Sequence, residues 1–271
     1  METRYATTDG AIRIAYEVRD QDAPDADWVL LIHGLGYARW GWEPVVDDLA
    51  ASFRVVLFDN RGIGGSEVPE GPYTATEMAQ DAVAVLEDAG IERSHVIGTS
   101  LGGMIAQELA VAAPERVDRL VLVASTPGVE TGHPMPEVTQ QLIARMPEMD
   151  PEEALRTAIE NALSDTTVDQ APEVVERILH HRTTTPQDPA GWQAQAAAGT
   201  QYEGGEQLRE IDAPTLIIHG SEDVVVDPRN ADVLAELIPD AQVERIDGVG
   251  HLSFWESAER FVRLVSEFLE G

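Results

Sequence analysis

One serine of the chain lies where a nucleophile would be exposed at the end of a strand. Ser100 follows the apolar run Val96-Ile97 and precedes a nearly all-apolar stretch that ends at Pro114. A strand-to-helix turn this tight needs small neighbours, and Gly98 and Gly102 supply the space. Backbone N–H groups at the start of the following helix would favour developing negative charge. The pattern predicts a nucleophilic Ser100, with an ordinary tight turn as the alternative.

A serine hydroxyl is a weak nucleophile and needs a general base. We assign this role to His251, which lies between the last predicted strand and the last predicted helix, at the carboxyl edge of a parallel sheet. His33 and His219 also end strands, each before a glycine, and they remain competitors for the role. His95 lies within the strand that precedes Ser100, and the three histidines of residues 126–207 are interpreted as structural or solvated: His133, His180 and His181.

The base in turn needs an orienting carboxylate. Asp223 follows the predicted strand 214–219 through a short turn, so it lies at the same carboxyl edge. Glu222 and Asp227 are close rivals in so acidic a chain. The oxyanion of an acyl-transfer reaction needs backbone donors. The N–H groups of Leu101, after the nucleophile, and of Leu35, after the third strand, are the candidates.

These residues must be positioned by an α/β fold, because strand-like and helix-like segments alternate along the chain. Residues 2–8 and 11–18 resemble a hairpin around Asp9-Gly10. Further apolar runs predict buried strands at 27–32, 53–59, 94–98, 118–124, 214–219 and 241–247. The segments between them predict helices at 43–51, 75–89, 101–113, 229–237 and 254–269.

The alternation stops in residues 126–207, which contain eight prolines and no convincing strand. Asp150-Pro151 is a good helix start, and a second helix is expected at 173–182. We therefore expect a helical cap at 126–207, inserted into a core domain of residues 1–125 and 208–271. The side chains expected to line the substrate pocket are Trp40, Trp42, Leu142, Met146 and Trp192. The sequence leaves open which cap arginine, if any, faces inward: Arg145, Arg156, Arg177 or Arg182.

Charge narrows the possible partners. The 271 residues, 43% of them hydrophobic, carry 49 Asp plus Glu against 18 basic residues, all of them Arg, and the net charge is −31. Such a chain repels nucleic acid and anionic membranes. Its composition resembles that of proteins from salt-accumulating halophiles. There is no cysteine, which excludes disulfides, thiolate metal sites and a cysteine nucleophile. The first residues have no signal-peptide pattern and the apolar runs are too short to span a bilayer, so a cytoplasmic location is expected.

Five stretches of the chain resemble the α/β-hydrolase superfamily: LLIHGLG, FDNRGIGGS, HVIGTSLGGMIAQELA, PTLIIHGSED and GVGHLSFWE. They occur in the family's order, and the resemblance extends over about 190 residues, essentially everything outside the cap. The resemblance implies the triad Ser100, Asp223 and His251, in the family's chain order, and an oxyanion hole at Leu35 and Leu101. It also implies a mostly parallel eight-stranded sheet flanked by helices, and a structural turn at Asp59 and Arg61.

The expected reaction is hydrolysis of a small-molecule ester or lactone through an acyl-enzyme, without a metal or organic cofactor. The spacing after the third strand resembles 3-oxoadipate enol-lactonases, small carboxylesterases and cofactor-free haloperoxidases. Two alternatives therefore remain. One is a haloperoxidase or perhydrolase that uses the same triad. The other is a ligand-binding receptor on a hydrolase scaffold. The sequence does not predict the oligomeric state.

Overall fold

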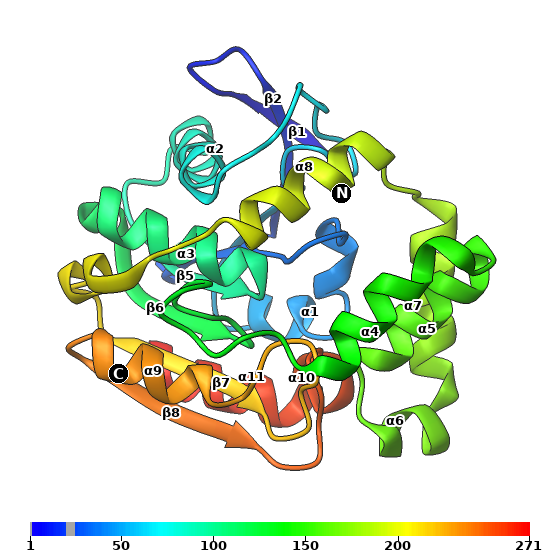
Figure 1. The fold of residues 1–271 in the computed structure, drawn as a ribbon. Helices are drawn as coiled ribbons and strands as arrows, with labels where there is room; N and C mark the ends of the chain where they lie inside the picture. Colours follow the sequence, from blue (N-terminus) through cyan, green and yellow to red (C-terminus); the bar gives the residue numbers. More distant parts are fainter. Residues whose placement is uncertain (1, 20–24) are drawn as a thin grey trace.

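A single eight-stranded sheet organises the chain (Figure 1). The computed structural model describes residues 2–19 and 25–271. The strands are β1 (Arg4–Thr7), β2 (Arg13–Arg19), β3 (Trp28–Ile32), β4 (Arg54–Phe58), β5 (Ser94–Thr99), β6 (Val117–Val123), β7 (Thr215–Gly220) and β8 (Ala241–Ile246). Their spatial order is β1-β2-β4-β3-β5-β6-β7-β8. Strands β1 and β2 pair antiparallel with their neighbours, and the remaining pairs are parallel. The predicted sheet is thus confirmed.

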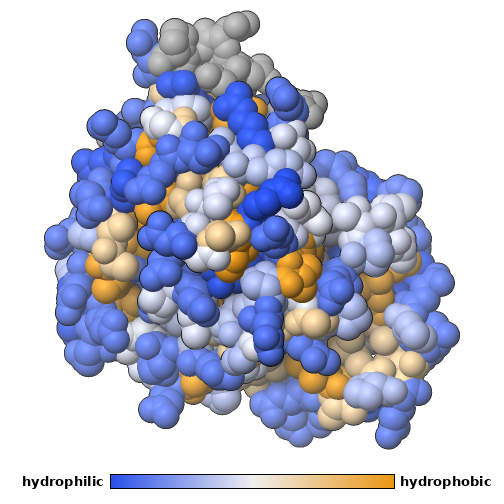
Figure 2. Space-filling view, turned by 90° about the horizontal axis from the view of Figure 1, so that it is seen from above, coloured by the Kyte–Doolittle hydropathy of each residue, from blue (hydrophilic) through white to orange (hydrophobic). Residues whose placement is uncertain are grey.

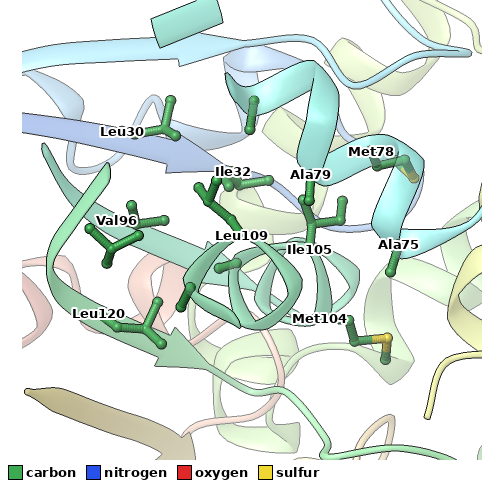
Figure 3. Packing of buried hydrophobic residues seen from close by; sticks show 14 of the residues in the cluster. Leu30, Ile32, Ala75, Met78, Ala79, Val96, Met104, Ile105, Leu109 and Leu120 are labelled. Atoms are coloured by element: carbon green, nitrogen blue, oxygen red, sulfur yellow. The ribbon is translucent and has the colours of Figure 1, made fainter. Parts of the chain in front are cut away.

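Helices cover both faces of the sheet, which explains the continuous apolar strands. One face packs against α2 (Ala75–Asp88), α3 (Leu101–Ala112) and α9 (Asn230–Leu237). Figure 3 shows Ile105 and Leu109 of α3 between the strand residues Ile32 and Val96 and the α2 residue Ala79. The other face packs against α1 (Val46–Ala50) and α11 (Ala258–Glu270).

Two predicted helices are divided in the structure. In the segment 43–51, only α1 (Val46–Ala50) is helical, and the 3-10 turn Arg39–Trp42 precedes it. The two are not continuous because Pro44 lacks the N–H that a continuous helix would use. The segment 254–269 is split into α10 (Ser253–Glu256) and α11, since the backbone of Ser257 is not helical, with a φ of −143° and a ψ of 58°. Both breaks lie close to the loops that carry site residues.

Five helices fill the chain between β6 and β7. They are α4 (Glu137–Arg145), α5 (Pro151–Asn161), α6 (Asp165–Gln170), α7 (Pro172–Thr184) and α8 (Pro189–Thr200). The side chain of Asp150 caps α5, as its position before Pro151 predicts, and Asp188 caps α8 in the same way. Figure 1 draws α4 to α7 as a group beside the sheet, with α8 running back across the core. Residues 126–207, which contain these five helices, are called the cap.

Hydrophilic residues cover most of the surface seen from above, and hydrophobic residues show between them in small groups (Figure 2). In the part of the chain that the structure describes, no helix is long and apolar enough to cross a membrane.

Candidate active site

Ser100 is held on a strained turn between β5 and α3. Its φ of 55° and ψ of −120° lie in a region that residues other than glycine rarely adopt. Its N–H donates to the carbonyl of Val123 on the neighbouring strand at 2.8 Å, which fixes the turn to the sheet. The side chain is partly exposed at the carboxyl end of a buried strand, as expected for a nucleophile elbow.

The glycines around Ser100 leave room that no other residue could use. A Cβ on Gly98 would lie 2.2 Å from the carbonyl oxygen of Gly102, and a Cβ on Gly102 would lie 2.1 Å from that of Ile32. On the loop after β3, a Cβ on Gly34 would lie 2.9 Å from the Cβ of Ser100. The backbone of this loop therefore passes directly beside the serine.

Asp223 and His251, which the sequence analysis expects to be the acid and the base, lie in contact. The Nδ1 atom of His251 lies 2.8 Å from Oδ2 of Asp223, although the residues are 28 apart in the chain. Oδ1 of Asp223 accepts the N–H groups of Val225 and Val226 at 2.8 and 2.9 Å. Burial raises the pKa of Asp223, but contacts with His251 and His219 outweigh burial and hold this pKa below its usual range.

The rival acids are engaged or exposed. Asp227 pairs with Arg229 at 2.5 Å, and this contact lowers the pKa of Asp227 to about 2. Glu222 is exposed. Only Asp223 among the three contacts a histidine within the described residues.

The competing histidines occupy different places. His219 is completely buried and also contacts Oδ2 of Asp223, through Nε2 at 3.0 Å. His33 stacks on Tyr37, and burial lowers the pKa of His33 to about 3, so it is neutral at ordinary pH. The structure does not join the base to the nucleophile: Oγ of Ser100 makes no hydrogen bond with any described residue.

The two backbone donors expected to bind an oxyanion are free within the described residues. The N–H groups of Leu35 and Leu101 have no acceptor in residues 2–19 and 25–271. Leu35 follows Gly34, which lies against Ser100, and Leu101 follows Ser100 itself. Both donors thus flank the serine, which is the arrangement an oxyanion hole requires.

The predicted pocket residues are spread over several environments. Trp192 is 38% exposed and lines a cavity of about 340 Å³ together with Arg182 and Gln187. Trp40 stacks on His181 of α7. Leu142 is buried and Met146 half-buried at the end of α4. Trp42 has no exposed surface and stacks on Phe254 in the core, so in this conformation it offers nothing to a substrate.

One cap arginine lies against the loop beside Ser100. Its Nη1 atom would be 2.8 Å from a Cβ on Gly36, and the guanidinium of this Arg182 lies 5.3 Å from the ring of Tyr37. No carboxylate of the described residues pairs with Arg182. The other cap arginines lie elsewhere: Arg156 pairs with Glu176, Arg177 pairs with Glu43, and Arg145 is exposed.

Two residues that the sequence analysis did not single out hold the site loops. Gln195 of α8 is buried, donates to the carbonyl of Arg61 at 2.7 Å and accepts the N–H of Gly36 at 3.4 Å. Glu256 accepts the N–H of Gly250, next to His251, at 2.7 Å. Nothing in the sequence around Gln195 marks it as a residue that holds the site loops. Glu256 could have been noticed, because it lies within the stretch GVGHLSFWE.

The turn at Asp59 and Arg61 is structural, in line with the expectation. Asp59 accepts the N–H groups of Arg39 and Gly65, and Arg61 binds Asp81 through two nitrogens at 2.6 and 2.7 Å. Among the described residues, no three His, Asp or Glu side chains gather in a way that could hold a metal ion.

These features of the fold and of the site indicate one family of proteins. Residues 27–258 match the family model described as alpha/beta hydrolase fold. The chain therefore belongs to the alpha/beta hydrolase family and is a hydrolase.

Relatives within this family are similar over nearly the whole chain. A 2-hydroxy-6-oxononadienedioate/2-hydroxy-6-oxononatrienedioate hydrolase of Cupriavidus pinatubonensis is 31% identical, covering 98% of this chain and 95% of that one. BpoC of Mycobacterium tuberculosis, provisionally named a non-heme bromoperoxidase, is 32% identical, covering 92% of this chain and 94% of BpoC. The crystal structure of an enol-lactonase from Burkholderia xenovorans superimposes with a TM-score of 0.86 at 25% identity, covering 99% and 100%.

Proposed function

We propose that the protein hydrolyses a carboxylic ester or lactone bond of a small molecule through a covalent intermediate on Ser100. The observation that carries the proposal is the 2.8 Å contact between His251 and Asp223, in a chain that holds Ser100 at positive φ on the turn after β5. The similarity to an enol-lactonase structure supports the lactone as a substrate class.

In the proposed reaction, Ser100 attacks the carbonyl carbon while Nε2 of His251 takes the hydroxyl proton. Asp223 accepts Nδ1–H of His251, which keeps Nε2 unprotonated and ready. The N–H groups of Leu35 and Leu101 bind the oxyanion. His251 then protonates the leaving oxygen, and a water that it activates releases the acid from Ser100. This sequence requires Oγ of Ser100 and Nε2 of His251 to approach when substrate fills the site, as catalytic hydrogen bonds often do.

The first experiment compares wild-type protein with Ser100→Ala on a p-nitrophenyl ester. Loss of the nucleophile should lower kcat by at least about 10³-fold without changing the melting temperature. A fluorophosphonate should label the wild-type serine once, whereas the ester should be turned over many times. Retained turnover in a folded Ser100→Ala protein would contradict the proposal, and labelling without repeated turnover would favour a receptor.

We further propose that the substrate carries a carboxylate that binds Arg182. The guanidinium of Arg182 has no acidic partner among the described residues, and it borders both the loop beside Ser100 and the cavity lined by Trp192. A guanidinium binds carboxylates through paired N–H donors. The name of the Cupriavidus relative, a dioate hydrolase, is consistent with an acidic substrate.

The test compares mono-p-nitrophenyl succinate with the neutral p-nitrophenyl pentanoate. Arg182→Gln should raise KM for the charged ester by about 10-fold to 100-fold, the value of a hydrogen bond to a charged group, and leave the neutral ester nearly unchanged. Arg145→Gln, on the exposed end of α4, is the matched control. An equal effect on both esters would remove Arg182 from substrate recognition.

The BpoC similarity favours one second candidate, a peroxide-dependent reaction at the same serine. An acyl-enzyme attacked by hydrogen peroxide instead of water would release a peracid. Bromination of monochlorodimedone with and without peroxide and acetate measures this reaction. A rate far below ester hydrolysis would leave hydrolysis as the function.

A further inference from the structure

The carboxylate of Asp223 binds two imidazoles on the same oxygen, and the reaction proposed above uses only one of them. Oδ2 lies 2.8 Å from Nδ1 of His251 and 3.0 Å from Nε2 of His219. The two rings reach it from different elements, because His219 ends β7 and His251 follows β8. The second imidazole is therefore part of the environment that sets the charge and direction of the acid.

The partners of His219 determine where its ring hydrogen lies. Nε2 faces two oxygens that can only accept, Oδ2 of Asp223 and the carbonyl of Val226 at 3.1 Å. An imidazole nitrogen between two acceptors must carry the hydrogen. Nδ1 of His219 is buried and has no hydrogen-bond partner among the described residues. His219 is thus a donor to the acid.

His219 has no path to a substrate. Its side chain is 0% exposed, and the nitrogen turned away from Asp223 is enclosed. A Cβ on the next residue, Gly220, would lie 2.2 Å from the carbonyl oxygen of Gly250, so the strand end is closed against the loop of His251. His251 contacts the acid through Nδ1, which leaves its Nε2 for the reaction.

We propose that His219 is a positioning residue that holds Oδ2 of Asp223 toward His251 and takes up part of the carboxylate charge. The inference rests on the proposed function. The backbone donors of Val225 and Val226 fix Oδ1, and His219 fixes Oδ2, so the carboxylate cannot rotate when His251 gains its proton. In a protein without His219, the carboxylate of Asp223 would keep more of its negative charge, and this charge would stabilise protonated His251.

The groups that face this pair are few. His219 on β7 and His251 on the loop after β8 are the titratable side chains that act on Asp223, and His33, from the loop after β3, acts on His251. His33 stays neutral above about pH 3, so it does not change charge in the range where the protein would be assayed.

The experiment compares His219→Leu, which removes the donor, with His219→Gln, which keeps an N–H at a similar distance. For His219→Leu we expect kcat to fall about tenfold and the acid limb of the kcat/KM profile to move up by about half to one pH unit, the effect of losing one hydrogen bond to a charge. His219→Gln should stay within about threefold of wild type, with its acid limb unmoved. His95→Leu, at a buried histidine of β5 remote from the acid, should also leave the acid limb unmoved.

Rates are normalised to the fraction of protein labelled by fluorophosphonate, so partial unfolding does not imitate the effect. A merely structural role would lower the labelled fraction in His219→Leu and leave the acid limb in place, which would overturn the proposal. A loss of about 10³-fold in His219→Gln, with His251→Gln active, would make His219 the base and would also overturn it.

A second measurement does not depend on turnover. The low-field proton resonance of Nδ1–H in His251, identified by its loss in Asp223→Asn, should shift in His219→Leu and keep its position in His219→Gln. If wild-type protein turns over no ester or lactone, the proposed function fails, while this resonance still tests the contact with His219. An unshifted resonance in His219→Leu would contradict the positioning role.

Discussion

Replacing Asp223 by asparagine exchanges one carboxylate oxygen for an amide NH₂ group at a position surrounded by donors. Four N–H groups converge on the two oxygens, from Val225 and Val226 on one side and from His219 and His251 on the other. The backbone donors cannot change, so the amide oxygen should take their side and the NH₂ group should face the imidazoles. His251 must then present an unprotonated Nδ1 and carry its hydrogen on Nε2.

This tautomer blocks the reaction, because Nε2 of His251 can no longer accept the proton of Ser100. We expect kcat/KM to fall by about 10⁴-fold, the loss known for a catalytic histidine in the wrong tautomer. Four decades correspond to about 5.5 kcal/mol of transition-state stabilisation at about 1.36 kcal/mol per decade. The folded structure should survive, since the amide keeps the size and the hydrogen bonds to the backbone.

The assay measures kcat/KM for a p-nitrophenyl ester in wild type, Asp223→Asn and the control Asp227→Asn, with melting curves for all three. Asp227 is close in the sequence but pairs with Arg229, so its variant should stay within about threefold of wild type. A loss below tenfold in a folded Asp223→Asn protein would refute the assignment of this residue as the acid.

Three further predictions concern stability. Gly102→Ala should lower the free energy of unfolding by about 3 kcal/mol in urea titrations, because its Cβ would lie 2.1 Å from a backbone oxygen; Gly199→Ala, with only an ordinary 3.7 Å contact, should be neutral or stabilising. Burial lowers the pKa of His33 to about 3. Below about pH 6.5 the imidazole of His33 therefore binds a proton in the unfolded chain but not in the folded chain, which destabilises the folded state. Between pH 7 and pH 5, the free energy of unfolding of wild type should fall by about 2 kcal/mol relative to that of His33→Asn. A difference between the two proteins that stays constant with pH would disprove this cause. Finally, the net charge of −31 makes the folded chain repel itself, and salt screens this repulsion as the Debye length falls from about 10 Å at 0.1 M to about 3 Å at 1 M. Raising KCl from 0.1 M to 1 M should therefore raise the melting temperature by at least about 5 °C. A melting temperature that does not change with salt would contradict this electrostatic account.

Strands β3 to β7 could be predicted because each is a short apolar run that is covered on both faces of the sheet. Their observed bounds differ from the expected ones by one or two residues at most ends. The helix predictions were less accurate where a single residue interrupts the backbone, as Pro44 and Ser257 do. In the cap, the pattern before Pro151 marked the start of α5, but α8, which carries Gln195 and Trp192, had no periodicity of its own because alanine and glycine fill it.

The sequence by itself indicated the tight turn at Ser100, because Gly98 and Gly102 follow an apolar run and precede a nearly all-apolar stretch. It also placed His251, Asp223 and the competitors His33 and His219 at one edge of the sheet, since each lies at or just after the carboxyl end of a parallel strand. Only the tertiary structure decided that Asp223 contacts both His219 and His251, while His33 packs among aromatic rings. The same holds for Arg182, which is one of four cap arginines until α7 packs it against Gly36. Residues at one edge share a neighbourhood by topology, whereas the contact between two side chains depends on loop paths that local sequence does not encode.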